Sequence, residues 1–294
     1  MSQDSTRLPR RVLGVICGPP RAGLTPWSEL IVETVRKHKH ILPNGVNEEA
    51  WAQLEWEFVS LYDNGDAILP DPETLRANFA AVIFSGSKLN TTEQIPWLDG
   101  AMSWIRTVIG PAATDGGATS SSVPLMGICF GHQLIAKSLG GVVDFNPRGV
   151  ELGTAPSTLN HANAVGDPLW RRVFGSDAAE TETKSILMQE LHWQSVLALP
   201  KNGAVSFAGS SMCDHQWVRY CTGVYGTQFH PEYPVEYMSE LGKFLPWQKV
   251  GDGDEQAGEA RKQAYYSGLT QASPQGCSIA AAFVDLAITA EPQQ

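Results

Sequence analysis

Short uninterrupted runs of apolar residues recur through the first half of the chain. They lie at 12–17, 58–62, 80–84 and 123–128, and each ends at turn-forming residues. Runs that are apolar on both faces are typical of strands in a parallel sheet covered on both sides. Between them, Thr25-Pro26 starts a predicted helix that continues to about Lys37, and residues 95–109 place apolar side chains at helical spacing. Strands that alternate with helices predict an α/β fold.

The second half of the chain shows strand-like segments with few helices between them. These segments lie at 141–145, 151–159, 185–191, 204–209 and 217–228. We therefore expect antiparallel strands to extend a mostly parallel sheet there. An acidic, glycine-rich stretch at 251–258 predicts a boundary near residue 248. Residues 1–248 would form the main domain, and residues 249–294 a helical C-terminal extension packed on that domain or on a second subunit.

Composition narrows the classes of function. Of the 294 residues, 43% are hydrophobic and 18% charged, as in folded globular proteins. The net charge of -10, with 21 Lys and Arg against 31 Asp and Glu, argues against nucleic acid as a partner. Five scattered cysteines fit a reducing, cytoplasmic compartment better than a disulfide framework. No apolar stretch reaches the ~20 residues that span a bilayer, so we expect no membrane association.

One stretch carries the clearest chemical signal. Residues 124–134 read PLMGICFGHQL, an apolar strand that enters a helix through G-x-C-x-G. Small residues on both sides of a nucleophile permit the sharp turn that exposes its side chain at the end of a strand. Cys129 is therefore the predicted nucleophile. The amide of Phe130 and the start of the following helix would bind an oxyanion and favour the thiolate.

A second motif supplies a base. In the stretch GTQFHPE at 226–232, a predicted strand ends at His230, and Pro231 turns the chain so that Glu232 returns toward the imidazole. A thiolate nucleophile needs a base, and the base needs a group that orients it. His-Pro-Glu alone is a weak signal, but together with the cysteine turn it predicts a Cys129, His230, Glu232 triad.

These motifs, GICFGHQ at 127–133 and QFHPE at 228–232, resemble those of the class I (triad) glutamine amidotransferases, and the resemblance extends over about residues 12–245. It implies a flavodoxin-like sheet with helices on both faces. It also implies roles for individual residues. Cys129 would be the nucleophile, His230 the base and Glu232 the group that orients the base. The amides of Gly86 and Phe130 would form the oxyanion hole. The substrate-binding residues would be Gln133, Trp193 and Gln194.

The sequence departs from the family pattern in two places. Ser87-Lys88 follows Gly86 where the family has Gly-Pro, and Trp193-Gln194 stands where many relatives have small or acidic residues. Both departures suggest altered substrate recognition. Among standalone relatives, SGS at 85–87 and HPEY at 230–233 look most like γ-glutamyl peptidases and GMP-synthase-like amidotransferase proteins.

The leading functional hypothesis is hydrolysis of a γ-glutamyl amide bond in a small-molecule peptide or conjugate, through a glutamyl thioester on Cys129. A glutaminase subunit that supplies ammonia to a separate synthase and a non-catalytic binding module are the alternatives. Homo-oligomerisation stays open. We expect no metal or other cofactor, because Cys213, His215 and Cys221 lack the paired spacing of zinc ligands. We also expect the irregular loop at 110–122 to border an opening for a bulky leaving amine.

Overall fold

A computed structural model describes residues 10–110, 120–175, 183–201 and 203–290. Its centre is an eight-stranded sheet with the order β2-β1-β3-β4-β10-β9-β6-β7. The strands are β1 (Arg11–Ile16), β2 (Glu55–Ser60), β3 (Ala81–Phe84), β4 (Ser120–Ile128), β6 (Glu151–Leu159), β7 (Ser185–His192), β9 (Val205–Gly209) and β10 (Trp217–Thr227). The pairs from β2 to β10 are parallel, and β9, β6 and β7 join antiparallel. The predicted α/β sheet, mostly parallel with antiparallel additions, is confirmed.

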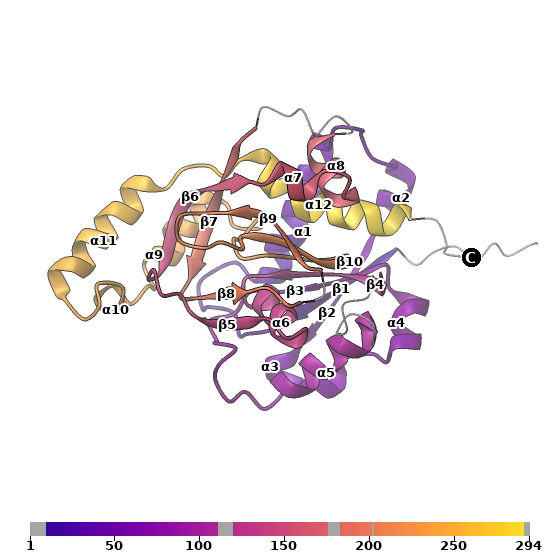
Figure 1. Ribbon diagram of the computed structural model, residues 1–294, viewed down its shortest axis with the longest axis horizontal. Coiled ribbons are helices and arrows are strands. Elements are labelled where there is room, and N and C mark those ends of the chain that lie inside the picture. The colour runs from indigo at the N-terminus through magenta and orange to yellow at the C-terminus, as the bar shows by residue number, and fades with distance from the viewer. Residues whose placement is uncertain (1–9, 111–119, 176–182, 202, 291–294) are drawn as a thin grey trace, which may run out of the picture.

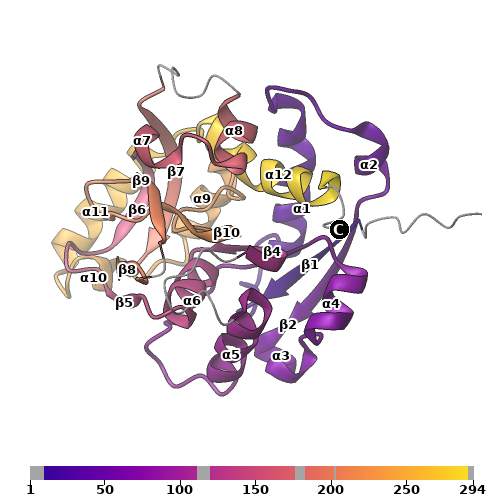
Figure 2. The ribbon, with the colours of Figure 1, turned by 45° about the vertical axis from the view of Figure 1, so that its right-hand side comes forward.

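Helices cover both faces of this sheet (Figures 1 and 2). One face packs against α1 (Trp27–His38), α8 (Pro168–Phe174) and α12 (Pro274–Thr289), and the other against α5 (Leu98–Ile109) and α6 (Phe130–Ser138). Alternate residues of one strand point to opposite faces. Accordingly Ile83 belongs to the first cluster and Phe84 to the second, and both are fully buried. This double burial explains why β1, β3 and the second half of β4 read as apolar runs, whereas the edge strand β2, EWEFVS, is partly exposed.

Shorter elements connect these layers. The helices among them are α2 (Glu48–Ala52), α3 (Leu61–Asn64), α4 (Pro72–Asn78), α7 (His161–Ala164), α9 (Val235–Gly242), α10 (Trp247–Val250), α11 (Glu255–Gly268) and the 3-10 turns η1 (Lys39–Ile41) and η2 (Asp66–Ile68). Two further strands, β5 (Val142–Phe145) and β8 (Gln194–Ala198), form a separate antiparallel pair. No helix of the described ranges combines the length and apolarity that crossing a membrane requires.

The C-terminal residues contribute to the core. Helix α12 buries most of its side chains against α1 and α8, and Ile279 and Phe283 lie in the same cluster as the sheet. A buried polar contact anchors this helix, because Asp285 accepts hydrogen bonds from Trp51 Nε1 at 2.6 Å and Arg172 Nε at 2.7 Å. In the described structure this segment therefore packs on the sheet. The division at residue 248 remains a prediction.

Two local expectations differ from the structure. Leu61 and Tyr62 start helix α3 rather than continue the strand. Residues 120–122 of the predicted loop belong to β4, where Ser120 pairs with Thr222. Residue 120 is the amino end of strand β4, and Cys129 follows the carboxyl end of the same strand. These two ends lie about 30 Å apart at ~3.3 Å per residue. Residues 111–119 of the predicted loop lie outside the described residues.

Candidate active site

Three neighbouring parallel strands deliver the predicted site residues to one edge of the sheet. In the register, Phe84 of β3 lies beside Gly127 of β4, and Gly127 lies beside Gly226 of β10. The carboxyl ends of parallel strands meet at a common edge, where ligands of open α/β sheets usually bind. Gly86, Cys129 and His230 follow these strand ends within a few residues and are thereby brought together.

Cys129 occupies a strained turn between β4 and α6. Its φ of 50° lies in the left-handed region, which side chains other than glycine rarely adopt. The turn needs glycine on both sides: a Cβ on Gly127 would lie 2.3 Å from the carbonyl carbon of Gly131, and a Cβ on Gly131 would lie 2.6 Å from the oxygen of Phe84. The spacing G-x-C-x-G therefore follows from backbone crowding, and it places the thiol at the amino end of α6.

His230 lies opposite this thiol and is held from two sides. Its Nδ1 is 2.8 Å from Glu232 Oε1, and its backbone amide donates to the carbonyl of Gln189 at 2.9 Å. The Glu232 contact leaves Nε2 as the ring nitrogen that can exchange a proton. A Cβ on Gly86 would come within 2.8 Å of His230 Cε1 and 3.6 Å of Cys129 Cβ. The backbone at Gly86 thus borders both side chains.

The electrostatics favour a charged imidazole. Burial lowers the pKa of His230, but the Glu232 carboxylate and the Cys129 thiol raise it, and the result is a pKa of about 10. At neutral pH the ring is therefore an imidazolium beside the thiol. Such a cation stabilises a thiolate, and the start of α6 adds the favourable end of a helix dipole.

A cavity of about 440 Å³ opens over these residues. The three predicted substrate residues all line it, but their side chains differ in what they contact. Gln133 Nε2 donates to the carbonyl of Gln194 at 2.8 Å and to Gln228 Oε1 at 3.0 Å. The Gln194 side chain turns to Thr91 and Thr92. Its Oε1 accepts from the backbone amide of Thr91 at 3.0 Å, and its Nε2 donates to the hydroxyl of Thr92 at 2.7 Å. Gln194 therefore ties the cavity wall to the loop after β3.

Phe130 packs its ring in the core and is not among the residues that line the cavity, so the oxyanion role of its amide stays a prediction. The residue directly follows Cys129 as the first residue of α6, and its side chain is fully buried against Trp97, with ring centroids 5.9 Å apart. Of the loop at 110–122, the described residues Gly110 and Ser121 do not line the cavity. Residues 111–119 lie outside the described residues, so the expectation that the loop borders an opening stays a prediction.

Aromatic residues that the sequence reasoning missed form part of the cavity wall. Tyr233 stacks on the imidazole of His230 with centroids 4.0 Å apart and planes 4° from parallel, and Tyr237 follows at 4.5 Å from Tyr233. The positions of Tyr233 and Tyr237 just after Glu232 are a sequence signal that they lie near the site. Trp27 and Phe145 line the cavity from distant segments, and nothing local in the sequence marks them.

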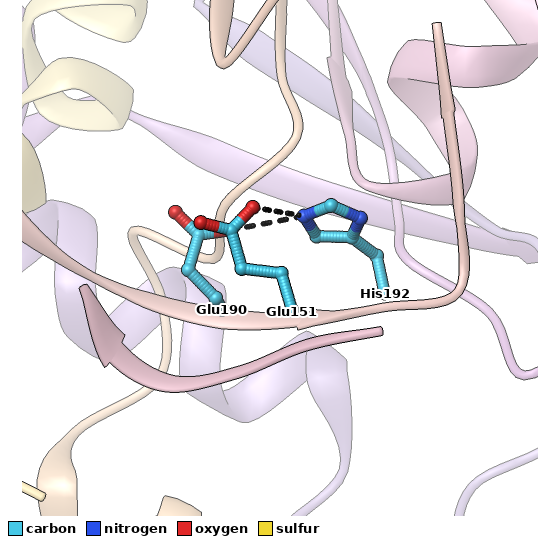
Figure 3. A group of neighbouring side chains, drawn as sticks. All are labelled: Glu151, Glu190 and His192. Carbon is cyan, nitrogen blue, oxygen red and sulfur yellow. Dashed lines mark hydrogen bonds and ion pairs between the residues drawn. The ribbon is translucent and has the colours of Figure 1, made fainter. Parts of the chain in front are cut away.

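A second buried histidine, His192, also lines the cavity. His192 Nε2 is 3.0 Å from Glu151 Oε2 and 3.4 Å from Glu190 Oε2 (Figure 3). The potential ligand atoms of these three residues lie within 4.8 Å of one another, the only such group among the residues the structure describes. The imidazole already bridges the carboxylates: burial lowers its pKa, but both glutamates raise it to about 10.

His132, within the GICFGHQ motif, points away from the site. Its side chain is fully buried, with Nδ1 2.9 Å from the hydroxyl of Tyr220. Burial and two other histidines lower its pKa to about 3, so the ring is neutral. It packs α6 against β10.

Comparisons with known proteins agree on the family. The family model described as "Glutamine amidotransferase class-I" matches residues 70–240, more than half of the chain. A glutamine amidotransferase-like protein of Schizosaccharomyces pombe is 25% identical over 77% of this chain and 81% of its own length. Gamma-glutamyl peptidase 5 of Arabidopsis thaliana is 32% identical over 40% of this chain and 43% of its own. A glutamine-hydrolysing GMP synthase subunit of Methanobrevibacter smithii is 33% identical over 37% of this chain and 50% of its own.

Solved structures support the fold. A glutamine amidotransferase from Thermotoga maritima superimposes with a TM-score of 0.57 at 14% identity, covering 95% of this chain and 99% of its own. At that identity the likeness concerns the fold alone. The family model nevertheless spans β3, β4 and β10 and so includes the strands that carry Cys129 and His230. The chain belongs to the class I glutamine amidotransferase family.

Proposed function

We propose that this protein hydrolyses the γ-glutamyl amide bond of a peptide or conjugate, with Cys129 as nucleophile, His230 as acid and base, and Glu232 as the group that orients His230. One observation supports this most directly. The strained turn at Cys129, the imidazole of His230 and the backbone of Gly86 meet at the floor of one cavity, with Glu232 2.8 Å behind the imidazole.

In the first half-reaction the Cys129 thiolate attacks the δ-carbonyl carbon of the γ-glutamyl group. The carbonyl π electrons move to the oxygen, and the amides of Gly86 and Phe130 would donate to that oxyanion. The C–N bond then breaks. His230 gives its Nε2 proton to the departing amine, and a glutamyl thioester with neutral His230 remains.

In the second half-reaction water attacks the thioester. His230 removes a proton from the water, the C–S bond breaks, and glutamate leaves while Cys129 returns to the thiolate and His230 to the imidazolium. Glu232 keeps Nδ1 bonded in both steps, so that the same ring nitrogen always faces the reacting atoms. Atoms and charges balance without any co-reactant other than water.

The wall of the cavity favours a leaving group larger than ammonia. Trp27, Tyr62, Phe145 and Trp193 line it, and free glutamine, whose leaving group is NH₃, would leave aromatic surface of this kind unused. The volume of about 440 Å³ falls within the range of sites for small organic ligands, about 300–1,000 Å³. The similarity to a gamma-glutamyl peptidase points the same way.

The test is intact-mass detection of a glutamyl thioester. The protein is mixed with glutamine or with γ-glutamyl dipeptides, quenched in acid and weighed, and released glutamate is measured in parallel. We expect the adduct and turnover in the unaltered protein and neither in Cys129→Ala. Cys221→Ala, which removes another buried thiol, is the matched control and should retain both.

The outcomes separate the competing functions. Turnover of glutamine that exceeds turnover of every γ-glutamyl peptide would favour a glutaminase subunit that supplies ammonia to a synthase. Absence of both adduct and turnover in a folded protein would favour a non-catalytic binding module. Retained turnover in Cys129→Ala would remove Cys129 from the mechanism.

A further inference from the structure

The cavity is basic although the protein is acidic. The chain carries 21 Lys and Arg against 31 Asp and Glu, yet Arg21, Lys88 and Lys249 line the cavity and, within the described ranges, no Asp or Glu does. The three cations come from separate segments: the loop before α1, the loop after β3, and α10. A positive cavity on an acidic chain selects for negative ligands.

Within the described part of the chain, no carboxylate forms an ion pair with these three cations. Arg21 is half-buried, whereas Lys88 and Lys249 are exposed. A half-buried guanidinium presents a fixed fork that matches a carboxylate. Arg21 is therefore the natural anchor, and the lysines add positive potential.

An aromatic wall connects the catalytic imidazole with this anchor. Tyr233 stacks on His230, and the ring of Tyr237 contacts Tyr233 at a tilt of 39°. Arg21 lies close enough to Tyr237 to lower the pKa of its hydroxyl, against the larger effect of burial. In the proposed mechanism the leaving nitrogen must lie at His230. A substituent on that nitrogen can then follow the two tyrosine rings outward to Arg21.

We propose that this wall and its cations form a leaving-group subsite for an amine that carries a carboxylate, with Arg21 as its principal ligand. The preferred substrates are then γ-glutamyl amino acids or peptides with an apolar side chain and a free carboxylate, and γ-glutamyl derivatives of cationic diamines are disfavoured. This inference rests on the proposed γ-glutamyl hydrolysis.

The same cations could serve a different part of the substrate, and the experiment must distinguish the two roles. Every γ-glutamyl compound carries an α-carboxylate on its glutamyl end, and the cations could bind that group instead. The two uses differ in one respect: only a leaving-group subsite distinguishes substrates whose glutamyl ends are identical.

The experiment uses a pair of substrates that differ by one carboxylate. We would measure kcat/KM for γ-glutamyl-phenylalanine and for γ-glutamyl-phenethylamine, with a γ-glutamyl diamine as third substrate. The unaltered protein should prefer the phenylalanine compound by at least about tenfold, the usual size of one hydrogen bond between charged groups. It should cleave the diamine compound least well. The preference should decrease as salt is raised.

Variants then assign the preference to Arg21. Arg21→Gln should bring the ratio of the two kcat/KM values close to one, and Lys249→Gln should lower it less. Arg36→Gln removes an equal charge from an exposed position of α1 outside this cavity and should keep the ratio. Thermal melting of each variant checks that the fold is intact.

Each contrary result has a distinct meaning. A ratio near one in the unaltered protein, with thioester formed and both compounds cleaved, overturns the subsite and leaves the proposed function standing. An equal loss for both substrates in Arg21→Gln assigns the cations to the glutamyl end and also overturns it. No thioester and no turnover with any γ-glutamyl compound overturns the proposed function and the subsite together.

Discussion

His230 and His192 are both buried imidazoles beside glutamate carboxylates, and in both the pKa is raised to about 10. Even the sequence spacing matches, since one residue separates His230 from Glu232 and His192 from Glu190. Their surroundings differ in one decisive way. His230 has one nitrogen on Glu232 and the other free to face Cys129, whereas His192 has Nε2 on Glu151 at 3.0 Å and Nδ1 3.1 Å from the carbonyl of Gln194.

The comparison teaches that a histidine-glutamate pair is not by itself a catalytic device. A ring with both nitrogens engaged has no position from which to exchange a proton with a substrate, so its charge serves only to hold its neighbours. His192 holds the carbonyl of Gln194, which also accepts from Gln133. His192 lines the cavity together with these residues, but both of its ring nitrogens are engaged in holding the wall.

The largest effect should follow from replacing His230, the histidine with one ring nitrogen facing Cys129. His230→Asn removes the proton donor and acceptor, and we expect kcat/KM for a γ-glutamyl peptide to fall by about a thousandfold or more, because general acid-base catalysis contributes ~10²–10⁴. Steady-state kinetics and thermal melting would be measured together. A folded variant that keeps a tenth of the activity would rule out His230 as the base.

Replacing His192, whose two ring nitrogens are both engaged, should reduce the stability of the fold instead. His192→Leu leaves Glu151 and Glu190 buried without their cation, and removing one partner of a buried ion pair costs about 3–5 kcal/mol. Chemical denaturation would measure this loss. His132→Leu is the matched control, since it deletes an equally buried but neutral imidazole and should cost less. Loss of activity at unchanged stability in His192→Leu would reverse the roles assigned to the two histidines.

Replacing Glu232, the proposed orienting group, should have a smaller effect on activity and should also change its pH dependence. Glu232→Gln should lower kcat/KM by about 10- to 100-fold, the range expected from one hydrogen bond to a charged group. Burial lowers the pKa of His230 and Glu232 raises it, so the variant should have a lower imidazole pKa. Activity that needs the imidazolium is lost as pH rises through this value. The alkaline limb, near pH 10 in the unaltered protein, should therefore move to lower pH; an unmoved limb would contradict this assignment.

The smallest effect is expected for Glu190, the second carboxylate beside His192. Glu190 lies 3.4 Å from His192 as an ion pair, and no described group donates a hydrogen bond of good geometry to either of its oxygens. Burial raises the pKa of this carboxyl. Its folded form therefore holds a proton more tightly than its unfolded form, and the associated stability decreases as pH rises above the unfolded value. Glu190→Gln should be close to neutral at pH 5 and stabilising by about 1 kcal/mol at pH 9.

Glu151→Gln is the contrasting variant for that measurement. Glu151 accepts from Ser210 at 2.7 Å, Gln216 at 2.9 Å and His192 at 3.0 Å. Loss of this well-bonded carboxylate should destabilise the protein over the same pH range. Equal behaviour of the two glutamate variants would show that the hydrogen bonds do not distinguish them.

Local sequence signals anticipated the residues at the sheet edge better than those behind it. Cys129 and its flanking glycines form a compact motif whose geometry follows from steric crowding, and the apolar runs gave the order of strands and helices. The cluster of Glu151 and His192 depends on the pairing register of β6 with β7, in which these two residues lie opposite each other. Register is set by the whole sheet and not by either segment alone.

The residues that line the cavity could not be predicted from the sequence for a similar reason. Arg21, Lys88 and Lys249 are ordinary solvated charges in the sequence, and only the folded chain brings their loops to one cavity. Helix α12 shows the same limit. The sequence predicted a helical extension packed on the main domain or on a second subunit, but its place against α1 requires contacts between segments more than two hundred residues apart.

That place of α12 has a consequence during synthesis. The ribosome makes β1, α1 and the whole sheet first, and one face of the sheet then lacks the helix that will cover Met188 and the other strand residues of the shared cluster. Until residue 289 has left the exit tunnel, a nascent chain with every proposed catalytic residue in place still displays uncovered apolar surface. Such surface promotes aggregation and recruits chaperones. Full burial of that face must therefore await the last described helix.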